Sequence, residues 1–98
     1  MKTQKIIAMD VWRRAGAFER AARPGDRVTR EVVDSFISAL PLVTLTESLV
    51  QCGPPRSYKF DDENGRWRET FTTFYRTEDG WQYRGHCFAG KDTEPQEH

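Results

Sequence analysis

The sequence has few cysteines, no net charge and no long apolar run. Two cysteines among 98 residues are too few for a disulfide scaffold, so both are predicted to be buried thiols in a reducing compartment. Fifteen Lys and Arg residues balance fifteen Asp and Glu residues, so no global field directs the protein to nucleic acid or to an acidic membrane surface. No apolar stretch approaches the roughly 18 residues that cross a bilayer. The N-terminal apolar run is too short for a signal peptide, and a cytoplasmic protein is expected.

Motifs for catalysis and for cofactors are also lacking. The sequence has no GxGxxG, P-loop, GxSxG or kinase signature, and no CxxC or HxxxH pairing, so neither a cofactor nor a metal is expected. His86 beside Cys87 suggests a thiol activated by an imidazole, but neighbours in a strand point to opposite faces. We therefore predict a non-enzymatic protein, and keep a small enzyme centred on Cys87 or His86 as an alternative.

The N-terminal half predicts two helices. The first begins at Asp10, a suitable N-cap, and stops at Pro24-Gly25. The second begins after Thr29 and ends at Pro41, with an apolar stripe at helical spacing. Residues 4–9 show no decisive period, and residues 42–53 fit either a helix or strands, with a strand favoured over 47–52.

The C-terminal half predicts an antiparallel meander with two tight turns. The turn 61–65 ends in a glycine, and a bulged loop there brings Phe60 opposite Trp67. The turn 77–80 repeats the device, and the same register places Thr77 opposite Trp81. The register continues with Tyr75 opposite Tyr83, Thr73 opposite Gly85, and Phe71 opposite Cys87.

Alternation along these two strands separates an apolar face from a basic face. The apolar face is expected to cover the helices and contains Trp67, Phe71, Tyr75, Trp81, Tyr83 and Cys87, with Glu69 as its one charge. The basic face has arginines and a histidine with two phenylalanines and no acid. Its candidate binding residues are Arg68, Phe74, Arg76, Arg84, His86 and Phe88.

Together these patterns predict an α+β domain in which two N-terminal helices pack on a three- to four-stranded antiparallel β-meander. A single domain over residues 1–90 is expected, because the chain is long enough for one core, with a flexible tail over 91–98. The expected function is binding of a protein partner through the exposed sheet face or an unpaired sheet edge. Nucleic-acid binding by the basic face, with phenylalanines stacking on bases, is the alternative.

Several short segments carry a resemblance to known sequences. They are Ala21-Ala22-Arg23-Pro24-Gly25-Asp26, Gly65-Arg66-Trp67-Arg68, and the residues Trp81, Tyr83, Gly85, Cys87, Phe88 and Gly90. In these segments the chain resembles small hypothetical proteins that bacterial genomes and mobile elements encode. The resemblance implies a bacterial cytoplasmic setting and assigns no functional residue.

Overall fold

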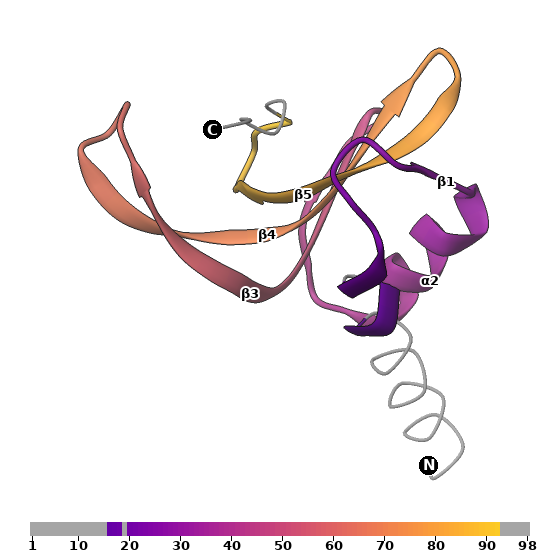
Figure 1. Cartoon of the computed structure of the whole chain (residues 1–98), viewed down its shortest axis with the longest axis horizontal. Coiled ribbons are helices and arrows are strands. Elements are labelled where there is room, and N and C mark those ends of the chain that lie inside the picture. Colours follow the sequence, from indigo (N-terminus) through magenta and orange to yellow (C-terminus); the bar gives the residue numbers. More distant parts are fainter. Residues whose placement is uncertain (1–15, 19, 93–98) are drawn as a thin grey trace, which may run out of the picture.

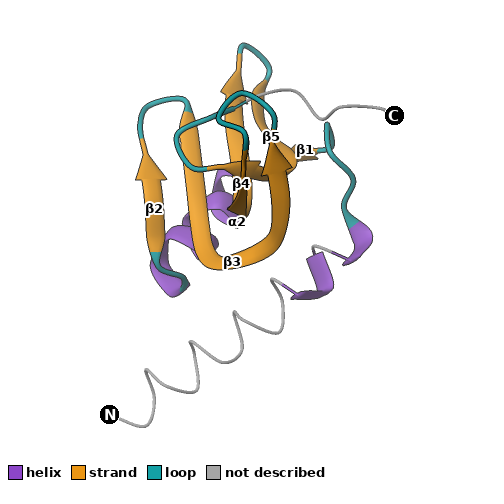
Figure 2. Cartoon of the chain, turned by 90° about the vertical axis from the view of Figure 1, so that its left-hand side faces the viewer, coloured by secondary structure: helices purple, strands orange, loops and turns teal. Residues whose placement is uncertain are grey.

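The computed structural model describes residues 16–18 and 20–92, which form one antiparallel sheet with helical segments on one side (Figure 1 and Figure 2). Residues 16–18 and 20–21 are helical. The other elements are, in chain order, β1 (Arg27–Val28), α2 (Arg30–Ala39), β2 (Leu42–Leu45), β3 (Leu49–Asp61), β4 (Arg66–Thr77) and β5 (Gly80–Phe88). The order of the five described strands in the sheet is β1-β5-β4-β3-β2.

The predicted arrangement, two N-terminal helices on a three- to four-stranded meander, is wrong. Five strands form most of the described fold, and the two helical segments are short. The segment after the Pro24-Gly25 turn enters the sheet as β1, because Gly25 N–H donates to Tyr83 O at 2.7 Å and Tyr83 N–H donates to Asp26 O at 2.8 Å. Residues 4–9, for which the sequence leaves a strand or a lead into the first helix open, and about half of the predicted first helix lie outside the described residues.

Residues 42–53 form strands, and the pairing of those strands explains why. Leu42 lies opposite Cys52 and Leu45 lies opposite Val50, so β2 folds back on the start of β3. Between them Thr46 Oγ1 accepts a hydrogen bond from Leu49 N–H at 3.0 Å, which closes the turn. The spacing of Leu42, Leu45 and Leu49 also fits a helix, but cross-strand pairing stabilises the strands instead.

Helix α2 begins as predicted. Thr29 Oγ1 accepts a hydrogen bond from Val32 N–H at 3.2 Å and so satisfies a backbone donor of the first turn. The helix directs Val33 and Phe36 onto the sheet, and its C-cap residue Leu40 packs beside them, so all three are buried.

The core lies between α2 and the sheet and is built around aromatic rings. Phe74 on β4 is fully buried, and its ring centroid lies 4.9 Å from that of Phe36. The ring of Phe18 contacts those of Phe36, Phe74 and Tyr83, with centroids 5.7, 6.0 and 5.2 Å apart. Trp81 is also buried, as predicted.

The register of β4 with β5 differs from the prediction between the turn and a bulge in β5, and it agrees with the prediction beyond that bulge. Thr77 pairs with Gly80 instead of Trp81, because the loop has two residues instead of three. A bulge in β5 between Tyr83 and Gly85 absorbs the difference, so Thr73 still pairs with Gly85. Between the turn and the bulge, every β4 residue therefore has a partner one position away from the predicted one.

This shift decides which β4 side chains enter the core. Phe74 pairs with Tyr83 and faces α2, although it was predicted to lie on the exposed face. Its strand neighbour Tyr75, which was predicted to face the helices, lies on the opposite face. A slip of one residue exchanges the faces of a strand, and here it reverses the predicted faces of β4.

Strand β3 bends sharply at Gly53-Pro54-Pro55-Arg56. Cys52 pairs with Thr72 while Ser57 pairs with Thr70, so these four residues lie opposite a single residue of β4. Proline has no N–H to donate to the ladder, and its φ is fixed, so the two prolines interrupt the pairing. Figure 1 shows the consequence, a β3–β4 hairpin that curves away from α2 to the far side of the molecule.

Candidate functional site

The projecting β3–β4 hairpin exposes three large aromatic side chains in mutual contact. Tyr58 is 62% exposed, Phe60 is 46% exposed and Trp67 is 57% exposed. The Tyr58 and Trp67 rings are stacked, 6.0 Å apart and 8° from parallel, and the Phe60 ring meets Trp67 edge-on at 5.7 Å. We call these three side chains the aromatic ridge.

Strand alternation explains why the ridge residues share a face. Phe60 lies directly opposite Trp67, as the sequence predicted, and Tyr58 lies opposite Glu69. Directly opposite residues point to the same side of a sheet, and residues two apart in one strand do so as well. The ridge therefore occupies one face of the hairpin with Glu69, which is exposed.

The opposite face of the hairpin carries its basic residues and one buried carboxylate. Asp61 Oδ2 accepts hydrogen bonds of 2.6 Å from Asn64 Nδ2 and from Arg68 Nη1. These two side-chain bonds, that of Asn64 first, lower the pKa of Asp61 from 3.8 to about 2. Lys59 and Arg66 also lie on this face, opposite Arg68 and Asp61 respectively. The two faces of the hairpin thus differ in chemistry, one aromatic with an acid and the other mainly basic.

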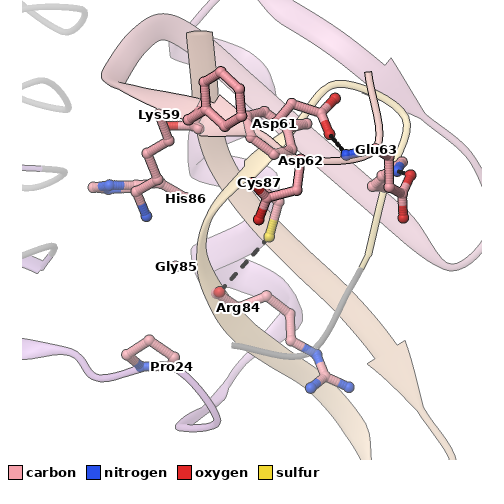
Figure 3. A pocket seen from close by; sticks show the side chains of 13 residues that line it. Pro24, Lys59, Asp61, Asp62, Glu63, Arg84, Gly85, His86 and Cys87 are labelled. Carbon is pink, nitrogen blue, oxygen red and sulfur yellow. Dashed lines mark hydrogen bonds and ion pairs between the residues drawn. The ribbon is translucent and has the colours of Figure 1, made fainter. Parts of the chain in front are cut away.

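A pocket of about 470 Å³ lies between the hairpin loop and β5 (Figure 3). Asp62 and Glu63 lie at one end of it, Pro24 and Arg84 at the other, with Cys87 between them. Its charges are mixed. Other lining residues are Lys59, Phe60, Asp61, Thr70, Gly85, His86, Phe88 and Lys91.

Two of the acids at this pocket already have basic partners. Lys91 Nζ pairs with Glu63, and Arg68 pairs with Asp61. No group of three or more His, Cys, Asp or Glu side chains that could hold a metal ion occurs among residues 16–18 and 20–92.

The two cysteines lie in different environments. Cys52 is fully buried, and burial raises the pKa of its thiol to about 11, so the thiol stays protonated at neutral pH. Cys87 lines the pocket with His86, and Cys87 Sγ lies 3.8 Å from Arg84 O as a weak donor. Both cysteines are buried thiols, as the sequence predicted.

The structure separates the six predicted binding residues. Arg84, His86 and Phe88 line the pocket, and the Arg68 guanidinium stacks on the Phe88 ring at 5.0 Å. The remaining two lie elsewhere. Phe74 is in the core and Arg76 is exposed at the other end of β4, opposite Trp81. Phe74 therefore offers no surface for stacking on a base.

Sequence reasoning missed the aromatic ridge, although it paired Phe60 with Trp67. It assumed that Trp67 continued the apolar face that covers the helices. The signal that was available is Gly53-Pro54-Pro55, which breaks the strand before the hairpin. A hairpin beyond such a break need not lie over the same core.

The edge strand β2 is a second exposed apolar feature. Leu42 is 44% exposed and Leu45 is 56% exposed. The register shifts between Leu42 and Thr44, which marks a bulge. Short length and a bulge are two devices that discourage strand addition at a sheet edge, so β2 is a weaker candidate contact surface than the ridge.

Within the described residues, no helix has the length and apolar content needed to cross a membrane. Comparisons of the chain with protein-family models, with curated proteins and with solved structures found no match.

Proposed function

We propose that this chain is a non-enzymatic protein-binding domain that contacts its partner through the aromatic ridge of the β3–β4 hairpin. One observation carries the proposal: Tyr58, Phe60 and Trp67 gather on one face of a projecting hairpin, and each remains about half exposed or more. Tyr, Trp and Phe are enriched at the buried centres of protein interfaces, where they supply contact area at low entropic cost.

Packing within the hairpin accounts for part of this arrangement. Cross-strand aromatic pairs stabilise antiparallel hairpins by about 0.2–1 kcal/mol each. That role does not require three such rings to stay exposed together. Exposure of neighbouring apolar groups to water is unfavourable in free energy, and binding of a partner removes those groups from water. Such patches therefore mark interaction sites.

The charges around the ridge favour protein over nucleic acid. The ridge face contains Glu69, and the hairpin's own Lys59, Arg66 and Arg68 lie on the opposite face. Binding of a nucleic-acid strand depends on cations that meet its phosphates next to the stacking rings. We place the protein-binding role in the bacterial cytoplasm, which the sequence resemblance implies.

The test is partner capture by the full chain from an extract of its source cells, compared with two variants. Trp67→Ser removes the centre of the ridge, and Leu45→Ser is the matched control, since the two side chains are 57% and 56% exposed. We expect proteins retained by the wild type and by Leu45→Ser to be reduced about tenfold or more with Trp67→Ser, as for a central interface residue. Equal retention by all three proteins would reject the ridge as the contact surface.

A folding control accompanies the capture experiment. Trp67 packs on neighbouring hairpin residues outside the core, so its replacement is expected to cost about 1 kcal/mol. Thermal unfolding of the Trp67→Ser protein should remain cooperative, with a midpoint within several degrees of the wild type.

A further inference from the structure

Within residues 16–18 and 20–92, other aromatic rings have an arginine stacked on them, whereas the rings of the aromatic ridge do not. Three arginines stack on rings: Arg30 on Trp81 at 5.5 Å, and Arg68 on Phe88 and Arg84 on Tyr75 at 5.0 Å each. Among the described residues, the ridge rings contact one another, and none of the cation–ring contacts involves them.

The acid beside the ridge, Glu69, likewise has no counter-ion in the part of the chain that the structure describes. Glu69 is exposed, and it forms no ion pair or hydrogen bond through its side chain with any residue in the described part of the chain. By contrast, Asp61 on the opposite face is paired with Arg68. An unpaired carboxylate beside exposed rings is complementary to a cation with a flat apolar surface.

From these two observations we infer that the ridge recognises an arginine side chain of the protein partner. The inference rests on the proposed function and names the chemistry of its partner. The guanidinium lies over the exposed Trp67 ring and donates hydrogen bonds to the Glu69 carboxylate.

Strand geometry allows one arginine to make both contacts. Trp67 and Glu69 are two residues apart on β4, so their side chains leave the same face about 7 Å apart. A guanidinium is planar, stacks on aromatic faces within about 6 Å of the ring centroid, and presents a fork of N–H donors to a carboxylate. A lysine ammonium is a compact, strongly hydrated charge and fits this pair of contacts less well.

The experiment uses the full chain and a fluorescent peptide in which arginine alternates with glycine. Matched peptides contain lysine or citrulline instead of arginine. Binding is measured at physiological ionic strength by anisotropy, and the indole N–H signal of Trp67 is followed by NMR. We expect the arginine peptide to bind and to shift that signal, the lysine peptide to bind several-fold more weakly, and the citrulline peptide not to bind.

Glu69→Gln tests the carboxylate, and Glu78→Gln is its control because Glu78 is exposed in the other hairpin turn. Glu69→Gln should weaken binding of the arginine peptide about tenfold, while Glu78→Gln leaves it unchanged. Equal affinities of the two variants, or peptide binding without a shift of the Trp67 indole signal, would overturn the inference. Preference of the ridge for a single-stranded oligonucleotide, or self-association through Trp67 in sedimentation, would overturn it as well.

Failure of this inference is distinguishable from failure of the proposed function. If Trp67→Ser abolishes partner capture but the arginine peptide does not bind, the ridge is a protein contact of another chemistry. If Trp67→Ser has no effect on capture, the proposed function itself fails.

Discussion

Replacement of Gln51 by leucine tests how the C-terminal end of the fold is held. Gln51 is fully buried on β3. Its Nε2 lies 3.2 Å from Thr73 Oγ1, 2.9 Å from Phe88 O and 3.1 Å from Lys91 O, and its Oε1 accepts a bond of 2.7 Å from Gly90 N–H. One amide therefore ties the segment after β5 to the middle of the sheet.

The hydrogen-bonding capacity of the amide sets the expected cost. Nε2 has two hydrogens, so its three acceptors share them, and the side chain makes about three full bonds including that to Oε1. At about 1 kcal/mol each, these bonds contribute about 3 kcal/mol. Thr73 Oγ1 keeps its bond to Phe71 O, Phe88 O keeps that from Lys91 N–H, and leucine adds apolar burial. We therefore expect Gln51→Leu to reduce the free energy of unfolding by about 2 kcal/mol.

Urea unfolding measures this cost, and amide hydrogen exchange at Gly90 shows where it arises. Gln82→Leu is the matched control, because Gln82 is half-buried on β5 and its side chain makes no hydrogen bond within the described residues. We expect the control to stay within about 0.5 kcal/mol of the wild type and to leave Gly90 protected. Equal stabilities of the two variants, with unchanged protection at Gly90, would refute the role of the Gln51 amide.

Three further predictions concern the core, the bulge and the hairpin carboxylate. Phe74→Ala should reduce the free energy of unfolding by about 3–5 kcal/mol in urea titrations, and a change below about 1 kcal/mol would contradict its place in the core. Gly85→Ala should lower the thermal midpoint, because Gly85 has φ +81° and a Cβ there would lie 3.1 Å from Pro24 Cγ; an unchanged midpoint would argue against the bulge. The pKa of Asp61 is lowered to about 2, Asn64 being the first cause, so its carboxylate stabilises the fold above about pH 4 and the contribution is lost as the pH falls towards 2. Asp61→Asn should flatten the pH dependence of stability over that range, and a slope identical to that of the wild type would count against the carboxylate.

The predicted functional surface illustrates how a local error propagates. Period-2 alternation correctly assigned Trp81 and Tyr83 to the core, yet the loop at 77–80 was given one residue too many. The bulge before Gly85 later restores the predicted pairing. Between these two points the predicted faces of β4 are reversed, so Phe74 was placed in the binding surface although it belongs to the core.

Three of the predicted binding residues, Arg84, His86 and Phe88, come together at the pocket. Alternation predicted that the three residues share one face. The bulge between Tyr83 and Gly85 breaks that alternation: Arg84 stacks on Tyr75, while His86 and Phe88 pair with Thr72 and Thr70 on the opposite face. The hairpin loop that faces them across the pocket was not predictable, since its position depends on the curvature of β3.

By itself, the sequence determined the local elements. Thr29 caps α2, Gly65 has the positive φ of a tight turn, and Phe60 meets Trp67 across the hairpin, because caps, turns and short-range pairing depend on neighbouring residues. The tertiary structure alone decided that residues 42–53 are strands, that Arg27–Val28 joins the sheet and that the aromatic ridge faces solvent. The first two depend on pairing with residues distant in sequence, such as Leu49 with Tyr75 and Val28 with Trp81. The exposure of the ridge depends on the bend at residues 53–56, whose direction no local pattern specifies.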